Sequence, residues 1–188
     1  MSKISLINDS SVTQNVDAIV NAANNMLYAG GGVCGAIFSK AGYEELTKAC
    51  KQYAVPLQDG QAVITPAFNI FNANYIIHAV GPNFNTKPNA LKELYMAYYN
   101  CLKVLKENNL TSISFPLISA GIFGGNLENP VATSTASCLS AYDTFTKENP
   151  YYDINVLLCA YSKSEFEEAS QVSVSYTHLR AHETGAYL

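Results

Sequence analysis

The chain has 188 residues, of which 48% are hydrophobic and 14% are charged, and its formal net charge is −4. This length fits one domain of ordinary size, and the high apolar fraction argues against disorder over most of the chain. The acidic balance argues against a protein that holds duplex nucleic acid through phosphate contacts, because such proteins carry a basic surface. The acidic net charge does not argue against a small anionic ligand, because backbone amides bind phosphates without lysine or arginine.

The cysteines are odd in number and widely scattered, at Cys34, Cys50, Cys101, Cys138 and Cys159. None of them forms a CxxC pair, so we expect neither a structural zinc site nor a disulfide framework. The first residues lack the apolar segment of a signal peptide, and no apolar run is long enough to span a bilayer. We therefore expect a cytoplasmic protein that does not bind membranes, and we expect it to be a monomer.

Short apolar runs alternate with helical patterns along the chain. The predicted strands are residues 4–7, 18–20, 62–66, 75–80, 112–118 and 154–160. The last two runs are almost continuously apolar, which is typical of interior strands that are covered on both faces.

Two strong helical patterns follow the fourth and fifth of these strands. Over residues 91–105, apolar side chains recur at the i, i+3, i+4, i+7 spacing of one helix face, with Asn89 as the expected N-cap. The second helix is expected to have Asn129 as its cap and Pro130 in its first turn, where proline is tolerated.

Two weaker helices are predicted earlier in the chain, over residues 33–41, ended by Gly42, and over residues 43–53. Strands that alternate with helices predict an α/β protein built as a three-layer α/β/α sandwich. Neither an internal repeat nor a linker divides the chain, so we expect one domain over residues 1–172.

The last segment, residues 173–188, follows a short helix-like segment at residues 164–169 and does not continue its pattern. Its Thr-His-Leu-Arg-Ala-His-Glu-Thr core resembles recurrent tails that arise from translation of a sequencing adapter. His178, His182 and Glu183 lie in this tail, but their spacing matches no zincin pattern, so no metal is assigned to them. We expect the tail to be non-native or disordered and to carry no function.

The segment from Asn21 to Gly35 carries the strongest functional signal. Its asparagines, Asn21, Asn24 and Asn25, precede a run of glycines that leads into the predicted helix at residues 33–41. Glycines let backbone N–H groups approach a ligand closely, and a helix N-terminus attracts anions. The segment therefore predicts a site for an anionic ligand. Its neutral carboxamides suit sugar hydroxyls better than a metal.

Gly30, Gly32 and Gly35 also satisfy the G-x-G-x-x-G pattern of dinucleotide-binding proteins. That fingerprint has to follow its strand immediately, whereas here the asparagine segment separates the glycines from the strand at residues 18–20. No Gly-Lys-Ser/Thr sequence follows the glycines, so the segment is not a P-loop either. A Rossmann dehydrogenase and a P-loop NTPase are both disfavoured.

A second loop of small residues follows the predicted strand at residues 112–118. It reads Ser119-Ala-Gly-Ile-Phe-Gly-Gly125. In open α/β sheets, ligands bind beyond the carboxyl ends of the strands, so the two glycine-containing loops are expected to enclose one ligand from two sides. His78 lies inside an apolar strand, and we expect it to be structural rather than catalytic.

Together these segments resemble the macrodomain family, whose members bind ADP-ribose. The resemblance covers roughly residues 3–170 and is carried by four segments in the same order, namely Val16-Asp-Ala-Ile-Val-Asn-Ala-Ala-Asn24, residues 30–35, Tyr75-Ile-Ile-His-Ala-Val-Gly-Pro82 and residues 113–124. It implies a mixed, mostly parallel sheet in the sandwich, with the ligand across the crest of the sheet. It also implies ADP-ribose or an ADP-ribosylated protein as the partner, and we expect neither cofactor nor metal. The acidic balance disfavours binding of nucleic acid, including a role in binding RNA or poly(ADP-ribose).

The resemblance further implies which residues bind the ligand. Asn24 and Phe123 would contact the distal ribose, while residues 31–33 and residues 119–122 would line the two sides of the diphosphate. Asp9 would accept a hydrogen bond from the adenine amine, and Tyr161 either stacks on adenine or is an exposed aromatic without a ligand. The complete predicted set is Asp9, Ala22, Asn24, Gly31, Gly32, Val33, Ser119, Ala120, Gly121, Ile122, Phe123 and Tyr161.

Many macrodomains hydrolyse bonds at the distal-ribose C1″, and in one large subgroup an aspartate that follows the glycines positions or activates water. Cys34 stands at that position here. A thiol is mostly protonated at neutral pH and is a poor base for water, unless a helix N-terminus activates it. In other macrodomains with cysteine at this point, the ligand's own phosphate is thought to orient the water.

The resemblance thus implies a mono-ADP-ribosyl hydrolase that also acts on O-acetyl-ADP-ribose. Its catalytic candidates are Asn24, Gly32 and Cys34. The alternative is a reader module, which binds ADP-ribose without cleaving it.

Overall fold

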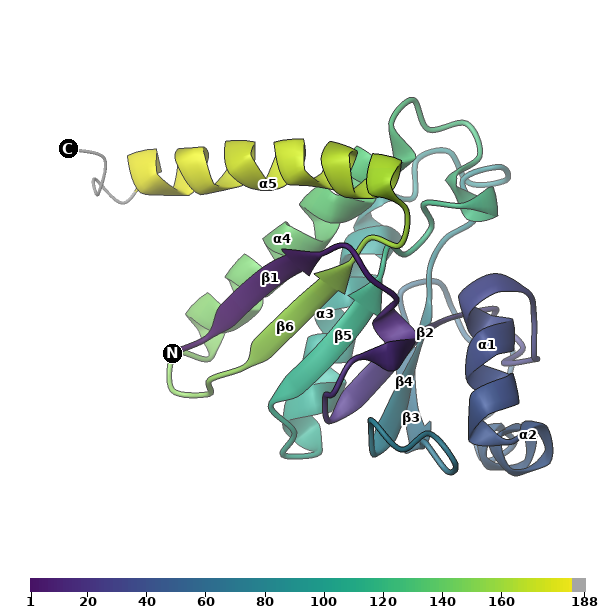
Figure 1. Ribbon diagram of the computed structural model, residues 1–188. Coiled ribbons are helices and arrows are strands. Elements are labelled where there is room, and N and C mark those ends of the chain that lie inside the picture. Colours follow the sequence, from purple (N-terminus) through teal and green to yellow (C-terminus); the bar gives the residue numbers. More distant parts are fainter. Residues whose placement is uncertain (184–188) are drawn as a thin grey trace.

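The computed structural model describes residues 1–183, with side chains described through residue 176 (Figure 1). One six-stranded sheet has the order β1-β6-β5-β2-β4-β3. Its strands are β1 (Lys3–Ile7), β2 (Ala18–Ala23), β3 (Ala62–Pro66), β4 (Tyr75–Val80), β5 (Ser112–Pro116) and β6 (Asn155–Cys159). Neighbouring strands are parallel, except that β3 pairs with β4 in the antiparallel direction. The predicted strands are therefore confirmed, although β2 runs further and β5 ends earlier than expected.

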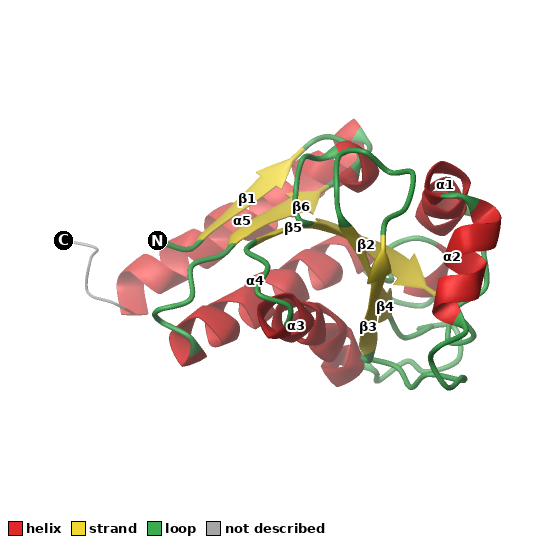
Figure 2. Ribbon diagram, turned by 90° about the horizontal axis from the view of Figure 1, so that it is seen from below, coloured by secondary structure: helices red, strands yellow, loops and turns green. Residues whose placement is uncertain are grey.

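Helices cover both faces of this sheet (Figure 2). They are α1 (Gly32–Ala41), α2 (Tyr43–Cys50), α3 (Leu91–Glu107), α4 (Pro130–Glu148) and α5 (Lys163–Glu183), with short 3₁₀ turns η1 (Ser11–Thr13) and η2 (Ile122–Gly124). The α1–α2 pair lies on one face and the α3–α4 pair on the other, while α5 packs on α4 and on the edge strand β1. This arrangement confirms the predicted three-layer sandwich with a mixed, mostly parallel sheet. No helix in the described part of the chain is long and apolar enough to cross a membrane.

Alternating side chains along the strands fill two separate cores. In β2, Ala18 and Val20 pack under α3 and α4, whereas Ile19 between them packs under α1 and α2. In β4, Ile77 and Ile76 divide between the two cores in the same way. The continuous apolar runs in the sequence thus reflect strands that are buried on both faces.

The helix ends agree only partly with the predictions. Gly42 ends α1 with φ 112°, in the left-handed region that favours glycine, and its N–H donates to the Phe38 carbonyl. Asn129 is the N-cap residue of α4, although its side chain makes no capping hydrogen bond. The prediction that Asn89 caps α3 is wrong, because the helix begins one residue later, after Ala90. Asn89 instead lines a surface pocket described below.

Helix α5 runs to Glu183 and is longer than the helix-like segment predicted at residues 164–169. Its Ala169 is buried, and the Tyr176 hydroxyl donates to the Leu139 carbonyl at 3.2 Å. Residues 184–188 and the side chains from residue 177 onward, including His178 and His182, lie outside the described residues. The expectation that residues 173–188 carry no metal and no function stays a prediction.

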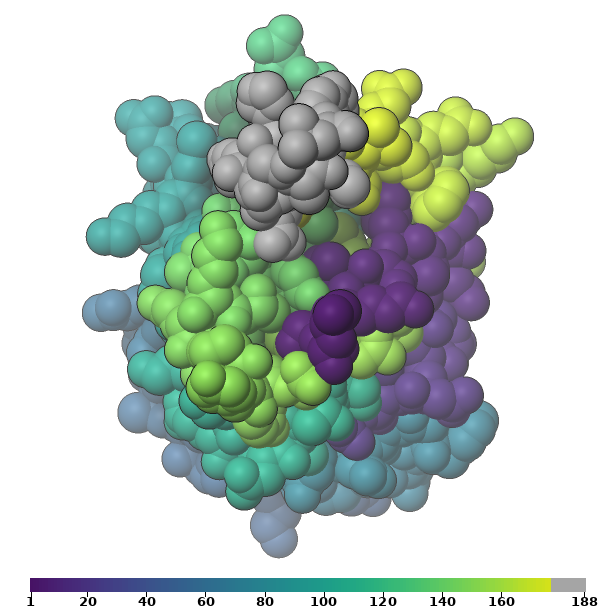
Figure 3. All heavy atoms as spheres, turned by 90° about the vertical axis from the view of Figure 1, so that its left-hand side faces the viewer, coloured from purple at the N-terminus to yellow at the C-terminus, as the bar shows by residue number. Residues whose placement is uncertain are grey.

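The start of the chain lies beside the loop between α4 and β6 (Figure 3). There the terminal amine donates to the Asp153 carboxylate at 2.8 Å. Both groups are largely exposed, so this ion pair contributes little to stability.

His78 on β4 is fully buried and joins three neighbouring strands. Its Nδ1 lies 3.1 Å from the Asn21 amide nitrogen on β2, and its Nε2 lies 2.9 Å from the Thr65 hydroxyl on β3. The ring therefore accepts on Nδ1 and donates from Nε2 as a neutral imidazole. Burial lowers the pKa of His78 to about 4, which agrees with a structural role. Asn21, which the sequence grouped with sugar-binding asparagines, is committed to this buried contact instead.

The free energy of unfolding is expected to fall as the pH drops from 6.5 towards 4. In the unfolded chain His78 titrates near 6.5, whereas its folded pKa is about 4, so between these values only the unfolded state binds the proton. The contribution of neutral His78 to the free energy of unfolding is therefore fully present above pH 6.5. At pH 4 about 3 kcal/mol of it is lost. Urea unfolding across this pH range measures the effect. His78→Gln, although less stable, should show a flatter pH dependence, and an equal slope in both proteins would contradict the prediction.

Candidate functional site

The carboxyl ends of the parallel strands meet at one edge of the sheet. After β2 the chain continues towards β3 and β4, whereas after β5 it continues through α4 to β6 on the other side. Because β2 and β5 are neighbours, their loops diverge, and the space between these two loops is called the crevice below. In open α/β sheets this switch point is the usual place for a ligand.

The loop after β2 is closed by the side chain of Asn24. Its Oδ1 accepts hydrogen bonds from the backbone N–H groups of Met26 and Tyr28, at 3.2 and 2.9 Å. Its Nδ2 donates to the Tyr28 carbonyl at 2.8 Å. Asn24 therefore shapes the loop, and its half-buried side chain lines a cavity described below.

The glycines that follow lie at the N-terminus of α1. Gly31 is the N-cap residue with φ −87°, and Gly32 begins the helix with φ 59°, in the left-handed region that favours glycine. A Cβ atom at either position would meet no described atom within 4 Å, so both face open space. At Gly35, by contrast, a Cβ would lie 2.5 Å from the Gly30 carbonyl oxygen, so glycine is needed there for packing. The unobstructed first turn offers free N–H groups and the positive end of the helix dipole to an anion.

Cys34 lies in the first turn of α1 but points into the protein. Its side chain is buried among the core residues under α1, and its thiol donates to the Tyr28 carbonyl at 3.6 Å. It does not line the cavity beside Asn24. In this position the thiol helps to hold the loop.

The loop after β5 forms the opposite side of the crevice. Ser119 has φ 57°, an unusual value for a residue other than glycine, and its hydroxyl donates to the Pro82 carbonyl at 2.7 Å. Beyond it, a Cβ atom at Gly121 would meet nothing in the described structure within 4 Å. Gly121 therefore faces open space, as Gly31 and Gly32 do on the opposite side.

A third loop, between β4 and α3, packs against the Ser119 loop and is hydrogen-bonded to it. A Cβ atom at Gly81 would lie 2.5 Å from Ser119 Oγ, so only glycine allows this close approach. The Phe84 N–H donates to the Phe123 carbonyl at 2.8 Å, and the Asn85 amide donates to the Ile122 carbonyl at 2.8 Å. The sequence assigned no ligand role to this loop, although it also follows the carboxyl end of a strand.

A closed ring of buried hydrogen bonds holds the residue before Ser119. The Ile118 N–H donates to the Tyr98 hydroxyl oxygen at 2.9 Å, and the Ser134 hydroxyl donates to the Ile118 carbonyl at 2.5 Å. Tyr98 and Ser134 are themselves joined at 2.6 Å, and Tyr98 must be the donor there because the Ser134 proton is already used. Burial raises the pKa of Tyr98 well above its ordinary value, so the phenol stays protonated. Side chains from α3 and α4 thereby set the start of the loop.

Tyr98→Phe is expected to lower the free energy of unfolding by about 1–3 kcal/mol, because it leaves the buried Ile118 amide without its acceptor. Amide hydrogen exchange at Ile118 should become faster in this variant. Tyr99→Phe is a matched control, since that neighbouring hydroxyl donates to Glu148 at an exposed position. Equal losses of stability in the two variants would contradict a special role for the ring.

Asn24 and Phe123 line the same cavity, which has a volume of about 270 Å³. These two predicted residues are far apart in sequence, and the structure brings them together. Asn25, which the sequence grouped with Asn24, lines the cavity as well. The polar residues Asp59, Asn83, Thr86 and Lys87, which sequence reasoning missed, also line it. Lys87 donates to the Asp59 carboxylate at 2.7 Å, which raises the pKa of Lys87 and keeps it charged.

The predicted adenine residues, Asp9 and Tyr161, lie at the ends of neighbouring strands. Ile7 of β1 is paired with Cys159 of β6, so both predicted residues follow the paired strand ends by two positions. The Asn8 amide ties the two segments together by donating to the Tyr161 carbonyl at 3.1 Å. Tyr161 is 79% exposed and Asp9 is exposed, so both can be reached by a ligand.

Two further predictions concern Ala22 and metals. Ala22 is half-buried within β2, and a ligand contact there stays a prediction. Across the described residues, no group of three His, Cys, Asp or Glu side chains could hold a metal ion.

By its architecture the protein is an α/β/α sandwich with a topological switch point at the carboxyl edge of its sheet and a cavity of about 270 Å³ beside Asn24. The family model described as "Macro domain" matches residues 20–134. The chain is 44% identical over 127 residues to the O-acetyl-ADP-ribose deacetylase of Salmonella typhimurium, covering 65% of this chain and 70% of that protein. The chain therefore belongs to the macro domain family.

Solved structures agree with this assignment. The Oceanobacillus iheyensis macrodomain with ADP superimposes with a TM-score of 0.82 at 32% identity, covering 95% of this chain and 93% of that one. The Trypanosoma brucei macrodomain in complex with ADP-ribose gives a TM-score of 0.77 at 28% identity, covering 89% of this chain and 68% of that one. The chain is thus similar to macrodomains that were solved with ADP and with ADP-ribose.

Proposed function

We propose that this protein binds ADP-ribose, hydrolyses the C1″ linkage of mono-ADP-ribosylated side chains, and also deacetylates O-acetyl-ADP-ribose. The observation that carries the proposal is the shared cavity of Asn24 and Phe123, beside two loops whose glycines face open space. Family membership and similarity to a named O-acetyl-ADP-ribose deacetylase support it. From its composition we propose further that it acts in the cytoplasm as a monomer, without cofactor or nucleic acid.

In this proposal the diphosphate lies between residues 31–33 and residues 119–122. The free amides at the start of α1 neutralise its charge, so no lysine or arginine is needed. The adenine lies towards Asp9 and Tyr161, and the distal ribose occupies the cavity beside Asn24. The described volume of about 270 Å³ is ample for one sugar ring.

Hydrolysis of an ester-linked substrate requires water to attack C1″ while the bond to the carboxyl oxygen breaks. The leaving group departs as a carboxylate, and the water proton passes to a carboxylate or a phosphate oxygen. Among the described residues that line the cavity, Asp59 alone carries a carboxylate, and Lys87 holds it in place. We assign the orientation of water to Asp59 and the ligand's own phosphate, with Asn24 fixing the ribose.

Cys34 and Asp59 are the two candidates for positioning or activating water, which an aspartate after the glycines does in one macrodomain subgroup. If Cys34 acts only by packing, Cys34→Ser should keep most of the turnover, whereas Asp59→Asn should lower kcat with little change in ADP-ribose affinity. Single-turnover hydrolysis together with calorimetric binding of ADP-ribose measures both quantities. A large loss of kcat in Cys34→Ser alone would return the catalytic role to the thiol.

A reader that binds without cleavage is the second candidate, favoured by the buried position of Cys34 and by the ion pair that occupies Asp59. Incubation with an automodified, mono-ADP-ribosylated protein separates the two functions. Loss of the label identifies a hydrolase. Tight binding of ADP-ribose with full retention of the label identifies a reader.

A further inference from the structure

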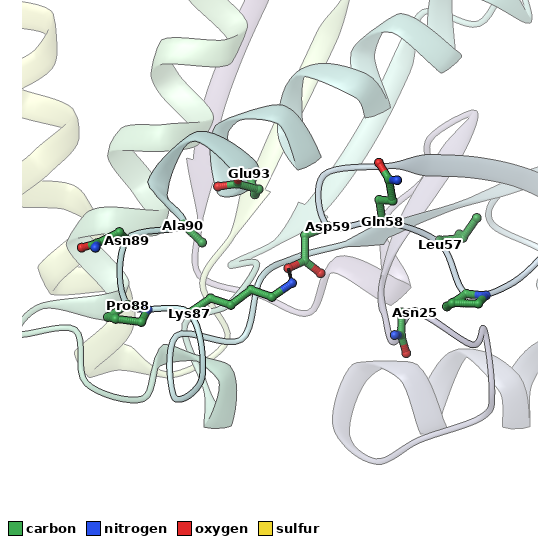
Figure 4. A pocket seen from close by; sticks show the side chains of 10 residues that line it. Asn25, Leu57, Gln58, Asp59, Lys87, Pro88, Asn89, Ala90 and Glu93 are labelled. Atoms are coloured by element: carbon green, nitrogen blue, oxygen red, sulfur yellow. Dashed lines mark hydrogen bonds and ion pairs between the residues drawn. The ribbon is translucent and has the colours of Figure 1, made fainter.

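A second and larger cavity adjoins the one that contains Asn24. Its volume is about 740 Å³, and it shares Asn25, Asp59 and Lys87 with the smaller cavity. Figure 4 shows Lys87 reaching from the loop before α3 across to Asp59. In this view Glu93 lies above the ion pair and Asn25 lies to its right. The Lys87–Asp59 ion pair therefore stands between the two cavities.

A substituent on C1″ of a ribose in the smaller cavity has to extend out of that cavity, either into solvent or past the wall that it shares with the larger cavity. The wall shared with the larger cavity consists of polar side chains, and Lys87 in it is 61% exposed at the side chain. A cavity of 740 Å³ lies within the range of sites for drug-sized ligands and far exceeds the needs of an acetyl group. Its size fits several amino-acid residues of a polypeptide.

The charged side chains of this larger cavity do not balance. Lys87 contributes +1, while Asp59 and Glu93 contribute −1 each, so the sum over these groups is −1. Asp59 is already paired with Lys87, which leaves the Glu93 carboxylate at the first turn of α3 as the surplus charge. The surrounding amides of Asn25, Gln58 and Asn89 offer both donors and acceptors to a peptide backbone.

We propose that the larger cavity binds the polypeptide segment next to the ADP-ribosylated residue, and that Glu93 makes it prefer segments with a lysine or arginine there over segments with an acidic residue. This inference rests on the proposed function, since it requires the distal ribose to lie beside Asn24. It names the substrate class as modified polypeptides rather than small esters alone.

The test uses two synthetic mono-ADP-ribosylated peptides that are identical except for lysine or glutamate beside the modified residue. At low ionic strength we expect kcat/KM and affinity to favour the lysine peptide by about tenfold. The two peptides differ by two units of charge near the half-exposed Glu93 carboxylate. Glu93→Gln should reduce this ratio to near one without changing the affinity for free ADP-ribose. Glu107→Gln, the same change in the exposed last turn of α3, should leave the ratio intact.

Equal preference in the wild-type protein, or a ratio that survives Glu93→Gln, overturns the inference. If the peptides bind but are not cleaved, the hydrolase proposal fails while the affinity ratio still tests the cavity. If acetyl ester and peptides are cleaved equally well and independently of Glu93, the hydrolase proposal holds and the peptide site does not. If neither ADP-ribose nor the peptides bind, both proposals fall.

Discussion

Gly31→Glu is expected to weaken ADP-ribose binding by at least about a hundredfold, because a carboxylate about 4 Å from a phosphate costs on the order of 4 kcal/mol at an effective dielectric near 20. The backbone at Gly31 has φ −87°, which any residue adopts, and a Cβ there meets no described atom within 4 Å. The folded state should therefore be unharmed. A negative charge at the helix N-terminus should even stabilise it slightly.

Gly31→Gln separates charge from size in this experiment. The two side chains are nearly equal in shape, so steric obstruction of the crevice would affect both variants alike. We expect the glutamine variant to bind clearly more tightly than the glutamate variant in titration calorimetry, with the gap narrowing at high salt. An unchanged affinity of Gly31→Glu for ADP-ribose would remove the diphosphate from the start of α1.

Asn24→Ala is expected to lower kcat/KM for a mono-ADP-ribosylated protein by at least about a hundredfold, through loss of ribose positioning. The change also removes three hydrogen bonds that shape the loop after β2. Circular dichroism and thermal unfolding should show that the domain stays folded, because the side chain is only half-buried and lies outside the core.

Asn24→Asp distinguishes the two roles of this residue. The aspartate keeps an oxygen that accepts from the Met26 and Tyr28 amides but loses the donor to the Tyr28 carbonyl. Turnover that recovers fully in Asn24→Asp would mean that loop shape matters and that the amide donor does not. Full residual hydrolysis in Asn24→Ala would take Asn24 out of the mechanism.

The sequence predicted the layers and the strands of this fold because burial leaves a periodic trace. Continuous apolar runs at β5 and β6 indicate strands covered on both faces. In β6, Val156 and Leu158 lie in the core under α3 and α4, while Leu157 packs against the other core. In β5, the second face is buried through Ser114, whose hydroxyl donates to the Ser11 carbonyl. The glycine that ends α1 was equally visible, since Gly42 adopts a backbone conformation that other residues rarely take. These features depend on local chemistry that can be read within one segment.

The polar partnerships were not predictable, because periodicity shows which side of an element is buried but not which polar atoms meet. Asn21 looked like its neighbour Asn24, yet it lies within β2 and faces His78, 57 residues away. Tyr98 belonged to an apolar stripe in the sequence, and nothing in that pattern pointed to Ser134 or to the amide of Ile118. The Lys87–Asp59 ion pair joins two loops that no motif marks.

The loop anchors have a consequence for the thermodynamics of binding. The Ser119 loop is held by the Tyr98–Ser134 ring and by the hydrogen bonds from Phe84 and Asn85, and the Asn24 loop is closed by its own side chain. All of these contacts join groups of the protein and need no ligand atom. They hold the backbone of both loops, so association should lose less conformational entropy than it would with two flexible loops. The two loops thus form a preorganised binding site. The affinity for a ligand then reflects the contacts with it, without a subtracted cost of ordering the loops.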